Sequence, residues 1–472
     1  MSLKTASDVT HNNSFLSILR EAITGSSRDF TTEPLGISLF LLAVPMILEM
    51  VMESVFAVVD VFFVGRLGPE AITIVGMTES MMFIIYAVGI GIGISGMAMI
   101  SRRIGEKNPD GAAVSATHTI YMGIAASLLM AVISIVFAPD FLRLLGAEPE
   151  IVIRGSLFAR ITLGGNLAVI MLFVLNFSFR GAGDASLAMR VLWAANILNC
   201  VLDPLLIFGI GPFPELGVNG AAIATLTGRS LGVLLAGYFL FRRVRHFTIR
   251  KEHWLLNTER LRRLLSLAWV AVLQFLIGTT SWLGLMKVMA LFGSKAVAGY
   301  TIAIRVVIFA LLPSVGMSNA AATMVGQNLG AKRPERAEKS VWLAALANAV
   351  FQTTIGIIFA LFAHQIASIF TSDPETLKHA EDALRIISYG FLFYAIGMVL
   401  ESCFNGAGDT RTPTLLNLFV LWIFEVPLAY FLAIHFGLGT HGVFWAITLA
   451  FSMLALVSGI LFKRGRWKEV VV

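Results

Sequence analysis

The amino-acid sequence repeats itself at an offset of 225 residues. The segment Gly181–Asp184 (GAGD) recurs as Gly406–Asp409, and Gly105–Pro109 (GEKNP) corresponds to Gly330–Pro334 (GAKRP) at the same offset. One offset that fits two distant pairs of segments indicates a tandem duplication whose halves remain in register. When both halves consist of hydrophobic segments, this construction is typical of secondary transporters, whose halves move about a site between them.

The composition requires a lipid environment. Of the 472 residues, 57% are hydrophobic and only 14% are charged, and the mean hydropathy is +0.82. The chain therefore has too few polar residues to cover a water-soluble globule of this size. Each half has six apolar runs that are long enough to cross the ~30 Å hydrocarbon core of a bilayer. These runs cover residues 35–63, 72–98, 114–138, 151–177, 187–210, 218–241, 264–291, 297–323, 341–366, 384–404, 414–436 and 441–462.

We therefore predict an all-α integral membrane protein with twelve transmembrane helices in two six-helix lobes. Because six is an even number, both lobes have the same orientation and the internal repeat is parallel. The predicted divisions are an N-terminal tail (1–33), a first lobe (34–241), a basic linker (242–263), a second lobe (264–463) and a C-terminal tail (464–472).

Lysine and arginine are distributed unevenly between the two sides of the predicted membrane. Most of the 35 such residues fall in the termini, in the linker and in the loops on the same side. Cytoplasmic loops keep positive charge, so we expect both termini in the cytoplasm of a prokaryote and a multi-pass chain in its inner membrane. The same asymmetry accounts for the net charge of +6, and no nucleic-acid partner is expected. Cys200 and Cys403 fall inside predicted helices, which argues against a disulfide framework.

Three acidic residues lie within the first apolar run. Glu49, Glu53 and Asp60 are four and seven residues apart, a spacing that places them in one stripe along a helix. An ionisable side chain in mid-membrane costs ~2.5–3.5 kcal/mol, and three neighbouring acids need protons or cations to compensate their charge. The alternative is a stripe that faces other helices with its hydrogen bonds made. Glu79 and Arg229 are expected to pair with each other or with this stripe.

The fifth apolar run repeats the pattern. Asn196, Asn199 and Asp203 share one helical face, and Pro204 leaves a backbone carbonyl without its helical donor. Carboxylate, amide and carbonyl oxygens are hard ligands that suit a small cation or a proton. Because Asp203 and Asp60 both lie in the outer parts of their runs, we expect them to meet at similar depth. The alternative is that these side chains only cap or bridge helices.

The acids of the first half are not repeated in the second half. At the offset of 225 residues, Asp60 corresponds to Leu285 and Asp203 to Leu428. The ionisable residues that the second half carries instead are Lys287, Arg305, Glu401 and Glu425. We expect these two bases and two acids to neutralise each other as buried pairs. The alternative is a second charge cluster that affects substrate binding or gating.

The repeated GAGD segments resemble part of a phosphate-binding loop only superficially. Neither a GxGxxG motif nor a Lys-Ser/Thr pair accompanies them, so we expect tight turns in which the aspartate caps the next helix. The eight histidines show no paired-ligand spacing, and no catalytic set is recognisable in the sequence. We therefore expect a protein that is not an enzyme and that uses no cofactor.

Several segments in combination resemble one transporter family. They are Val59–Gly68 (VDVFFVGRLG), Arg180–Asp184 (RGAGD), Asn199–Gly209 (NCVLDPLLIFG) and Gly217–Thr225 (GVNGAAIAT). Together, over about residues 34–463, the chain resembles the multidrug and toxic compound extrusion (MATE) family. The resemblance implies two six-helix lobes around a V-shaped cavity, and export of organic, often cationic, compounds in exchange for protons or sodium ions.

The resemblance also implies a cation site in the first lobe. This site would comprise Asp60, Asn199 and Asp203, holding either Na⁺ or protons, with Thr225 as a fourth ligand and Thr227 as its alternative. Accessory positions near it are Glu53, Glu49, Asn196 and Glu79. The acids that NorM-like members carry in helices seven and ten have no counterpart here, with Tyr394 near the tenth-helix position. This pattern favours the DinF-like or archaeal-type prokaryotic branch.

The resulting hypothesis is an antiporter that works as a monomer among membrane lipids. It would export amphipathic organic cations in exchange for protons or sodium ions, because the same oxygens serve both ions. The main alternative is a flippase for a lipid-linked precursor, which would favour a strongly basic cavity. A sensor or membrane enzyme is disfavoured, since neither a soluble domain nor a catalytic set is recognisable in the sequence.

Overall fold

The computed structural model describes residues 14–472, and every regular element in that range is a helix. A short amphipathic helix, α1 (Phe15–Thr24), precedes the first lobe. The helices of the first lobe are α2 (Leu35–Gly65), α3 (Pro69–Gly105), α4 (Pro109–Leu144), α5 (Pro149–Gly164), α6 (Asn166–Ala182), α7 (Ala185–Phe208) and α8 (Val218–Arg242). The linker contains one 3₁₀ turn, η1 (Lys251–Trp254).

The second lobe repeats this order. Its helices are α9 (Thr258–Ala290), α10 (Ser294–Gly330), α11 (Pro334–Ser368), α12 (Pro374–Ser388), α13 (Phe391–Ala407), α14 (Arg411–Asn417), η2 (Leu418–Glu425), α15 (Val426–Tyr430), η3 (Phe431–His435) and α16 (Thr440–Lys463). The helix from α14 to η3 is continuous but widened by π-helical turns at η2 and η3. A final 3₁₀ turn, η4 (Arg466–Glu469), follows α16.

The spans agree in place and number with the prediction. Eleven helices of residues 14–472 are long and apolar enough to cross a membrane, and a bent pair, α12 and α13, supplies the twelfth. The breaks within the fourth and tenth spans lie at Gly165 and Gly390, which are equivalent positions of the repeat. The helices are longer than their apolar runs, because α3 and α10 each have 37 residues and so extend about 55 Å.

The repeated turns show where the two halves differ. Gly183 and Gly408 have φ of 88° and 87°, the left-handed conformation that favours glycine. Asp409 accepts hydrogen bonds from the backbone and hydroxyl of Thr412 in the first turn of α14, as expected. Asp184 occupies the N-cap position of α7 as expected, but its side chain makes no capping hydrogen bond; its carboxylate instead accepts from the Arg245 backbone N–H of the linker, 3.1 Å away.

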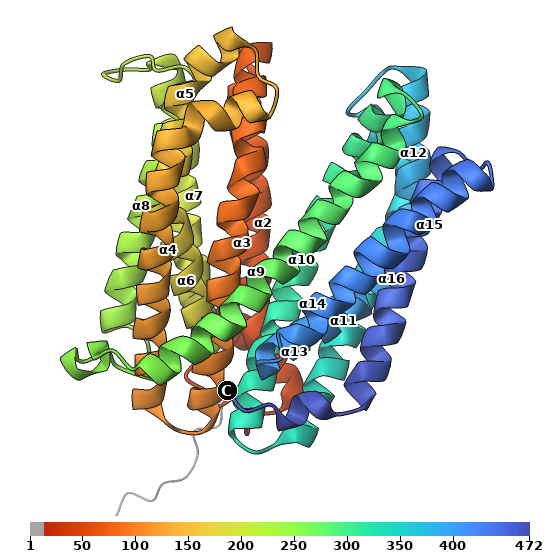
Figure 1. Cartoon of the computed structure of the whole chain (residues 1–472). Helices are drawn as coiled ribbons and strands as arrows, with labels where there is room; N and C mark the ends of the chain where they lie inside the picture. Colours follow the sequence, from red (N-terminus) through yellow and green to blue (C-terminus); the bar gives the residue numbers. More distant parts are fainter. Residues whose placement is uncertain (1–13) are drawn as a thin grey trace, which may run out of the picture.

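The helices α2 and α9 each pack into both lobes. Figure 1 shows α9 crossing diagonally from one lobe to the other. Its first half contributes to the first-lobe core and its last turns to the second-lobe core. A Cβ on Gly91 of α3 would lie 2.5 Å from Val272 of α9, and a Cβ on Gly316 of α10 would lie 2.8 Å from the backbone of Ile47 of α2. Both pairs are equivalent under the repeat, so the crossing is symmetric.

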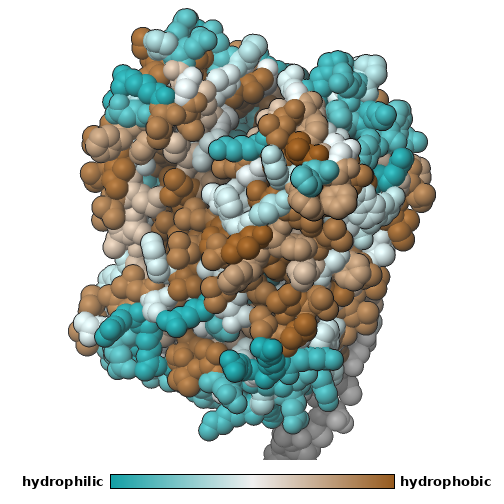
Figure 2. All heavy atoms as spheres, turned by 45° about the vertical axis from the view of Figure 1, so that its right-hand side comes forward, coloured by the Kyte–Doolittle hydropathy of each residue, from teal (hydrophilic) through white to brown (hydrophobic). Residues whose placement is uncertain are grey.

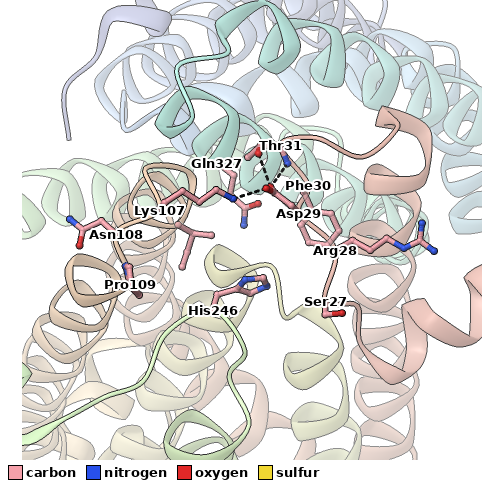
Figure 3. Close-up of a pocket in the computed structure, with 11 residues that line it drawn as sticks. Ser27, Arg28, Asp29, Phe30, Thr31, Lys107, Asn108, Pro109, His246 and Gln327 are labelled. Carbon is pink, nitrogen blue, oxygen red and sulfur yellow. Dashed lines mark hydrogen bonds and ion pairs between the residues drawn. The ribbon is translucent and has the colours of Figure 1, made fainter. Parts of the chain in front are cut away.

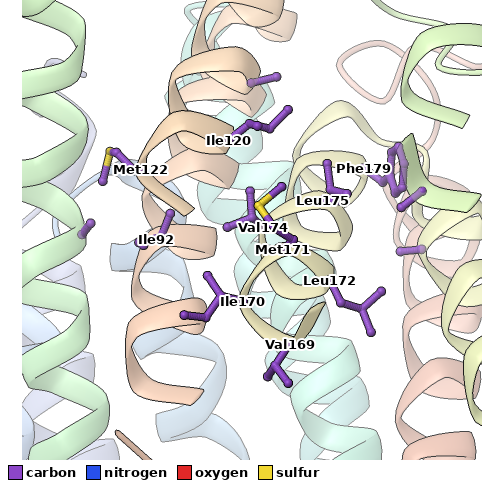
Figure 4. Packing of buried hydrophobic residues seen from close by; sticks show 14 of the residues in the cluster. Ile92, Ile120, Met122, Val169, Ile170, Met171, Leu172, Val174, Leu175 and Phe179 are labelled. Carbon is purple, nitrogen blue, oxygen red and sulfur yellow. The ribbon is translucent and has the colours of Figure 1, made fainter. Parts of the chain in front are cut away.

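A large hydrophobic cluster fixes the first lobe. Figure 4 shows Ile92 of α3, Ile120 of α4 and Ile170 of α6 within this packing. All three side chains are almost completely buried. Because lipid tails are as apolar as these side chains, close van der Waals packing, rather than removal from water, holds the helices of the lobe together inside the bilayer.

The lobes meet at the end of the molecule where both described termini lie, which we call the closed end (Figure 1). There the strap of residues 25–34 connects them, because Asp29 pairs with Lys107 of the first lobe at 2.5 Å and Arg333 of the second lobe donates to the Thr31 carbonyl at 2.6 Å. Figure 3 shows the Lys107–Asp29–Thr31 contact beside a cavity of about 330 Å³. Burial opposes ionisation of Asp29, but the hydrogen bonds from Lys107 and Thr31 outweigh it and lower its pKa to about 2.

At the other end, which we call the open end, the lobes lie apart (Figure 1) and the molecular surface is hollowed between them (Figure 2). Glu79 of α3 and Arg305 of α10 are exposed there. Closer to the closed end, the same two helices bury Ser101 and Gly326 against each other. The protein therefore has a cleft between α3 and α10 that is accessible from the open end.

Candidate functional site

The Asp203 carboxyl is buried without a partner. Its side chain on α7 is fully buried, and neither of its oxygens receives a hydrogen bond from any described residue. Pro204 follows inside the same helix and has no N–H to donate to the Cys200 carbonyl. An unsatisfied buried carboxyl of this kind is costly and calls for a proton or a cation.

Asn199 lies one turn before Asp203 on α7, and its side chain contacts Thr225 of α8. The Asn199 Nδ2 donates to the Thr225 hydroxyl at 2.9 Å, and the Asn199 Oδ1 remains without a partner. The helices α7 and α8 approach closely at Gly228, where a Cβ would lie 2.7 Å from the Ala195 carbonyl. This contact turns Thr225 toward α7. Thr227, the alternative, is exposed and donates to its own helix at Ile223, so the structure places Thr225 at the site.

Arginines compensate two acids of the α2 stripe. Glu49 pairs with Arg180 of α6 at 2.7 Å, and the two side chains are 1% and 5% exposed, which excludes Glu49 from an aqueous site. Glu53 accepts a hydrogen bond from Asn196 at 3.0 Å and lies 3.8 Å from Arg229 of α8. Of the two expectations for Arg229, pairing with Glu79 or with the stripe, the structure shows pairing with the stripe. Arg180 belongs to the RGAGD segment, but nothing in the sequence spacing indicates that it pairs with Glu49.

Asp60 is the acid of the stripe that no described arginine or lysine pairs with. It is half-buried near the end of α2. The helix α2 packs against α7. Asp60 and Asp203 are therefore acids on two neighbouring helices, and among the described residues neither forms an ion pair with a base.

The donor set fits a proton or a sodium ion. The described residues contain no group of three or more His, Cys, Asp or Glu side chains that could hold a metal ion. The oxygens that lack partners are both oxygens of Asp203 and the Oδ1 of Asn199, with the Thr225 hydroxyl next to them. Hard oxygens with few formal charges suit a monovalent cation, whereas a thiolate or imidazole cluster would suit a transition metal.

The charged residues of the second lobe do not form the expected pairs. Among the described residues no ion pair joins Lys287, Arg305, Glu401 and Glu425 to one another, so the prediction of mutual neutralisation was wrong. The two bases are exposed, whereas Glu425 is buried and Glu401 half-buried, each with one unpartnered oxygen. The four residues lie on four different helical segments, and the faces that carry them do not meet.

Comparison with known proteins agrees with this architecture. The MatE family model matches residues 45–205 and again residues 270–431, one match in each half of the chain. The chain belongs to the MatE family.

Relatives of this MatE protein resemble it over nearly its whole length. A probable multidrug resistance protein NorM of Thermotoga maritima is 27% identical over 434 residues, 91% of this chain and 93% of that protein. An FAD transporter of Shewanella oneidensis is 28% identical and covers 84% of this chain and 88% of its own length. A solved structure described as the outward-facing conformation of a multidrug resistance MATE family transporter superposes with a TM-score of 0.87 at 27% identity, covering 93% and 97% of the two chains.

Proposed function

We propose that this MatE protein is a secondary multidrug efflux transporter that exchanges organic compounds for protons or sodium ions. The observation that carries the proposal is the Asp203 carboxyl, fully buried and without a partner beside Asn199 and Thr225. Relatives over most of the chain are named as multidrug resistance or multidrug export proteins. A buried ionisable group inside a membrane marks an ion pathway by default.

The proposed orientation places the closed end in the cytoplasm, because the basic residues of the linker and termini gather there. The cleft is then open to the outside, where the driving ion enters. Binding of one inward-moving charge is worth about 2.3 kcal/mol per 100 mV of membrane potential. The ion drives export only if it binds the outward-open and inward-open states with different affinity.

Asp60 and Asp203 supply such a difference. They lie on α2 and α7, and α2 also packs into the other lobe through Ile47 and Gly316. Compensation of the two carboxyls removes their mutual repulsion and favours closer packing of α2 on α7. Because α2 is anchored in both lobes, a change in this packing changes the relation of the lobes and hence the affinity of the cleft for its substrate.

The alternative is a flippase for a lipid-linked precursor. A diphosphate headgroup would require a strongly basic cavity. The first-lobe side of the cleft instead carries Asp60 and Glu79, and the exposed base deep in the cleft wall of α10 is Arg305. The charge distribution therefore favours export of organic compounds over translocation of a diphosphate.

The test is transport of rhodamine 123, an organic cation, by purified protein in proteoliposomes under an imposed sodium gradient and, separately, a pH gradient. One gradient is expected to drive export, and Asp203→Asn is expected to abolish the gradient-driven component. The substitution breaks no hydrogen bond to a described residue, so folding is expected to persist. Asp140→Asn, at an exposed ion pair with Arg143, is the matched control. Wild-type transport by Asp203→Asn would refute the proposal.

A further inference from the structure

Arg305 is a cation on α10 that has no ion-pair partner among the described residues, and it lies at membrane depth. It lies eleven residues after Ser294, the first residue of α10 at the open end, which corresponds to a depth of about 16 Å along the helix. Its side chain is exposed, and no described residue forms an ion pair or hydrogen bond with it. An arginine at membrane depth costs ~2.5–3.5 kcal/mol, so it requires a partner or a function.

The helical geometry directs Arg305 into the cleft. Gly316, eleven residues further along α10, packs against Ile47 of α2, the helix that packs into both lobes. Eleven residues are close to three full turns, so Arg305 lies on the same face of α10 as Gly316. Phe309, between them on that face, is 38% exposed. The face that joins the lobes near the closed end is therefore the face that lines the cleft near the open end.

The opposite wall carries an acid at the same depth. Under the repeat, Arg305 is equivalent to Ser80 of α3, the residue next to Glu79. Glu79 is exposed as well. Lys287 differs, because it lies three residues from the end of α9 and can reach the membrane surface with its long side chain.

Arg305 and Phe309 form a combined surface for an anionic aromatic group. They are four residues apart and so are neighbours on the helix surface. A guanidinium binds a carboxylate through two parallel hydrogen bonds, and an exposed ring one turn below offers contact to an apolar body. A gate in which Arg305 merely pairs with Glu79 when the open end closes would require no exposed aromatic ring beside the arginine.

We propose that Arg305 binds a carboxylate of the exported compound, and that the transporter therefore prefers aromatic zwitterions to their esters. The cationic end of such a compound would face Glu79 and Asp60 on the first-lobe wall, and its ring system would lie against Phe309. This inference rests on the proposed efflux function and specifies its substrate class. It adds a carboxylate to the amphipathic cations expected from the sequence, and it takes up the alternative that a second-lobe charge affects substrate binding.

The test uses two dyes that differ by one methyl ester. Rhodamine 110 has a free carboxylate and rhodamine 123 is its methyl ester. Binding of each dye to the purified full-length protein is measured by fluorescence anisotropy, and efflux is measured in proteoliposomes. The wild type is expected to bind rhodamine 110 at least 10-fold more tightly. Arg305→Gln is expected to weaken rhodamine 110 binding 10- to 100-fold, the loss of a hydrogen-bonded charge pair, and to change rhodamine 123 binding less than 2-fold.

Controls separate the alternatives. Arg305→Lys keeps the charge without the paired hydrogen bonds and is expected to be intermediate, whereas Lys287→Gln is expected to leave the dye preference unchanged. Equal losses for both dyes in Arg305→Gln, reproduced by Glu79→Gln, would identify a gate and overturn the proposal, as would no loss at all. Gradient-driven efflux without dye preference would refute this inference alone. Arg305-dependent binding without gradient-driven efflux would support it and refute ion coupling.

Discussion

The buried pair between Glu49 and Arg180 allows the energetics of the α2 stripe to be tested directly. The two side chains are 1% and 5% exposed and their charged atoms are 2.7 Å apart. Among the described residues, the other polar contact to the carboxylate is from Asn176, at 3.4 Å. Arg180→Met would therefore leave an almost uncompensated charge in the core. Loss of one partner of a buried ion pair costs about 3–5 kcal/mol, whereas replacement of both partners by apolar side chains costs much less.

A double-mutant cycle distinguishes these costs. Arg180→Met and Glu49→Met are each expected to destabilise the protein by about 3–5 kcal/mol, and the double variant by less than either, which corresponds to a coupling energy of several kcal/mol. The measurement is unfolding in mixed detergent and SDS micelles. The exposed pair Glu150 and Arg154, also 2.7 Å apart, is the control, with an expected coupling of at most about 1 kcal/mol. If the losses of unfolding free energy in the two single variants add up in the double variant, Arg180 does not stabilise the Glu49 charge.

Three further predictions concern the closed end, the crossing helices and the ion site. Asp29→Asn is expected to loosen the strap and speed trypsin cleavage at residues 25–34. The folded pKa of Asp29 is about 2, below its ordinary 3.8, so the Lys107 contact persists above pH 4 and weakens only as the pH falls toward 2. The ratio of the cleavage rates of Asp29→Asn and wild type, which cancels the pH dependence of trypsin itself, is therefore expected to stay constant between pH 5 and 8, and a ratio that changes would contradict this assignment. Gly91→Val and Gly316→Val are each expected to destabilise the protein by about 1–3 kcal/mol or more, because each side chain would overlap a crossing helix; equal stability in thermal unfolding would refute the close packing. Thr225→Val removes a hydroxyl that bonds to Asn199 and is expected to raise the driving-ion concentration for half-maximal efflux roughly 10-fold, and an unchanged value would exclude Thr225 from the site.

The sequence predicted the scaffold because the scaffold depends on local and periodic properties. Apolar length located the spans, and the repeat located the turns at Gly183 and Gly408. The sequence also indicated Asp203 and Asn199 as candidate site residues, since polar residues on one helical face are conspicuous in an apolar run.

The pairing of charges was less predictable, because it depends on which faces of distant helices meet. Glu49 and Arg180 are separated by 131 residues, and nothing in the spacing of the stripe identifies the arginine. Thr225 could be separated from Thr227 only through the close approach at Gly228. The prediction of ion pairs in the second lobe was wrong for the same reason. The sequence shows that the numbers of acids and bases balance, but not which side chains are in contact.

The symmetric crossing of α2 and α9 makes the two halves of the chain mutually dependent folding units. Each repeat places its first helix partly in the core of the other, through the equivalent contacts at Gly91 and Gly316. A single repeat on its own would expose to lipid the groove that its partner's helix fills, and two such repeats would form an exchanged dimer. The fused chain preserves that arrangement, so a break in the linker is expected to be tolerated only when both fragments are made in the same cell, with each completing the other.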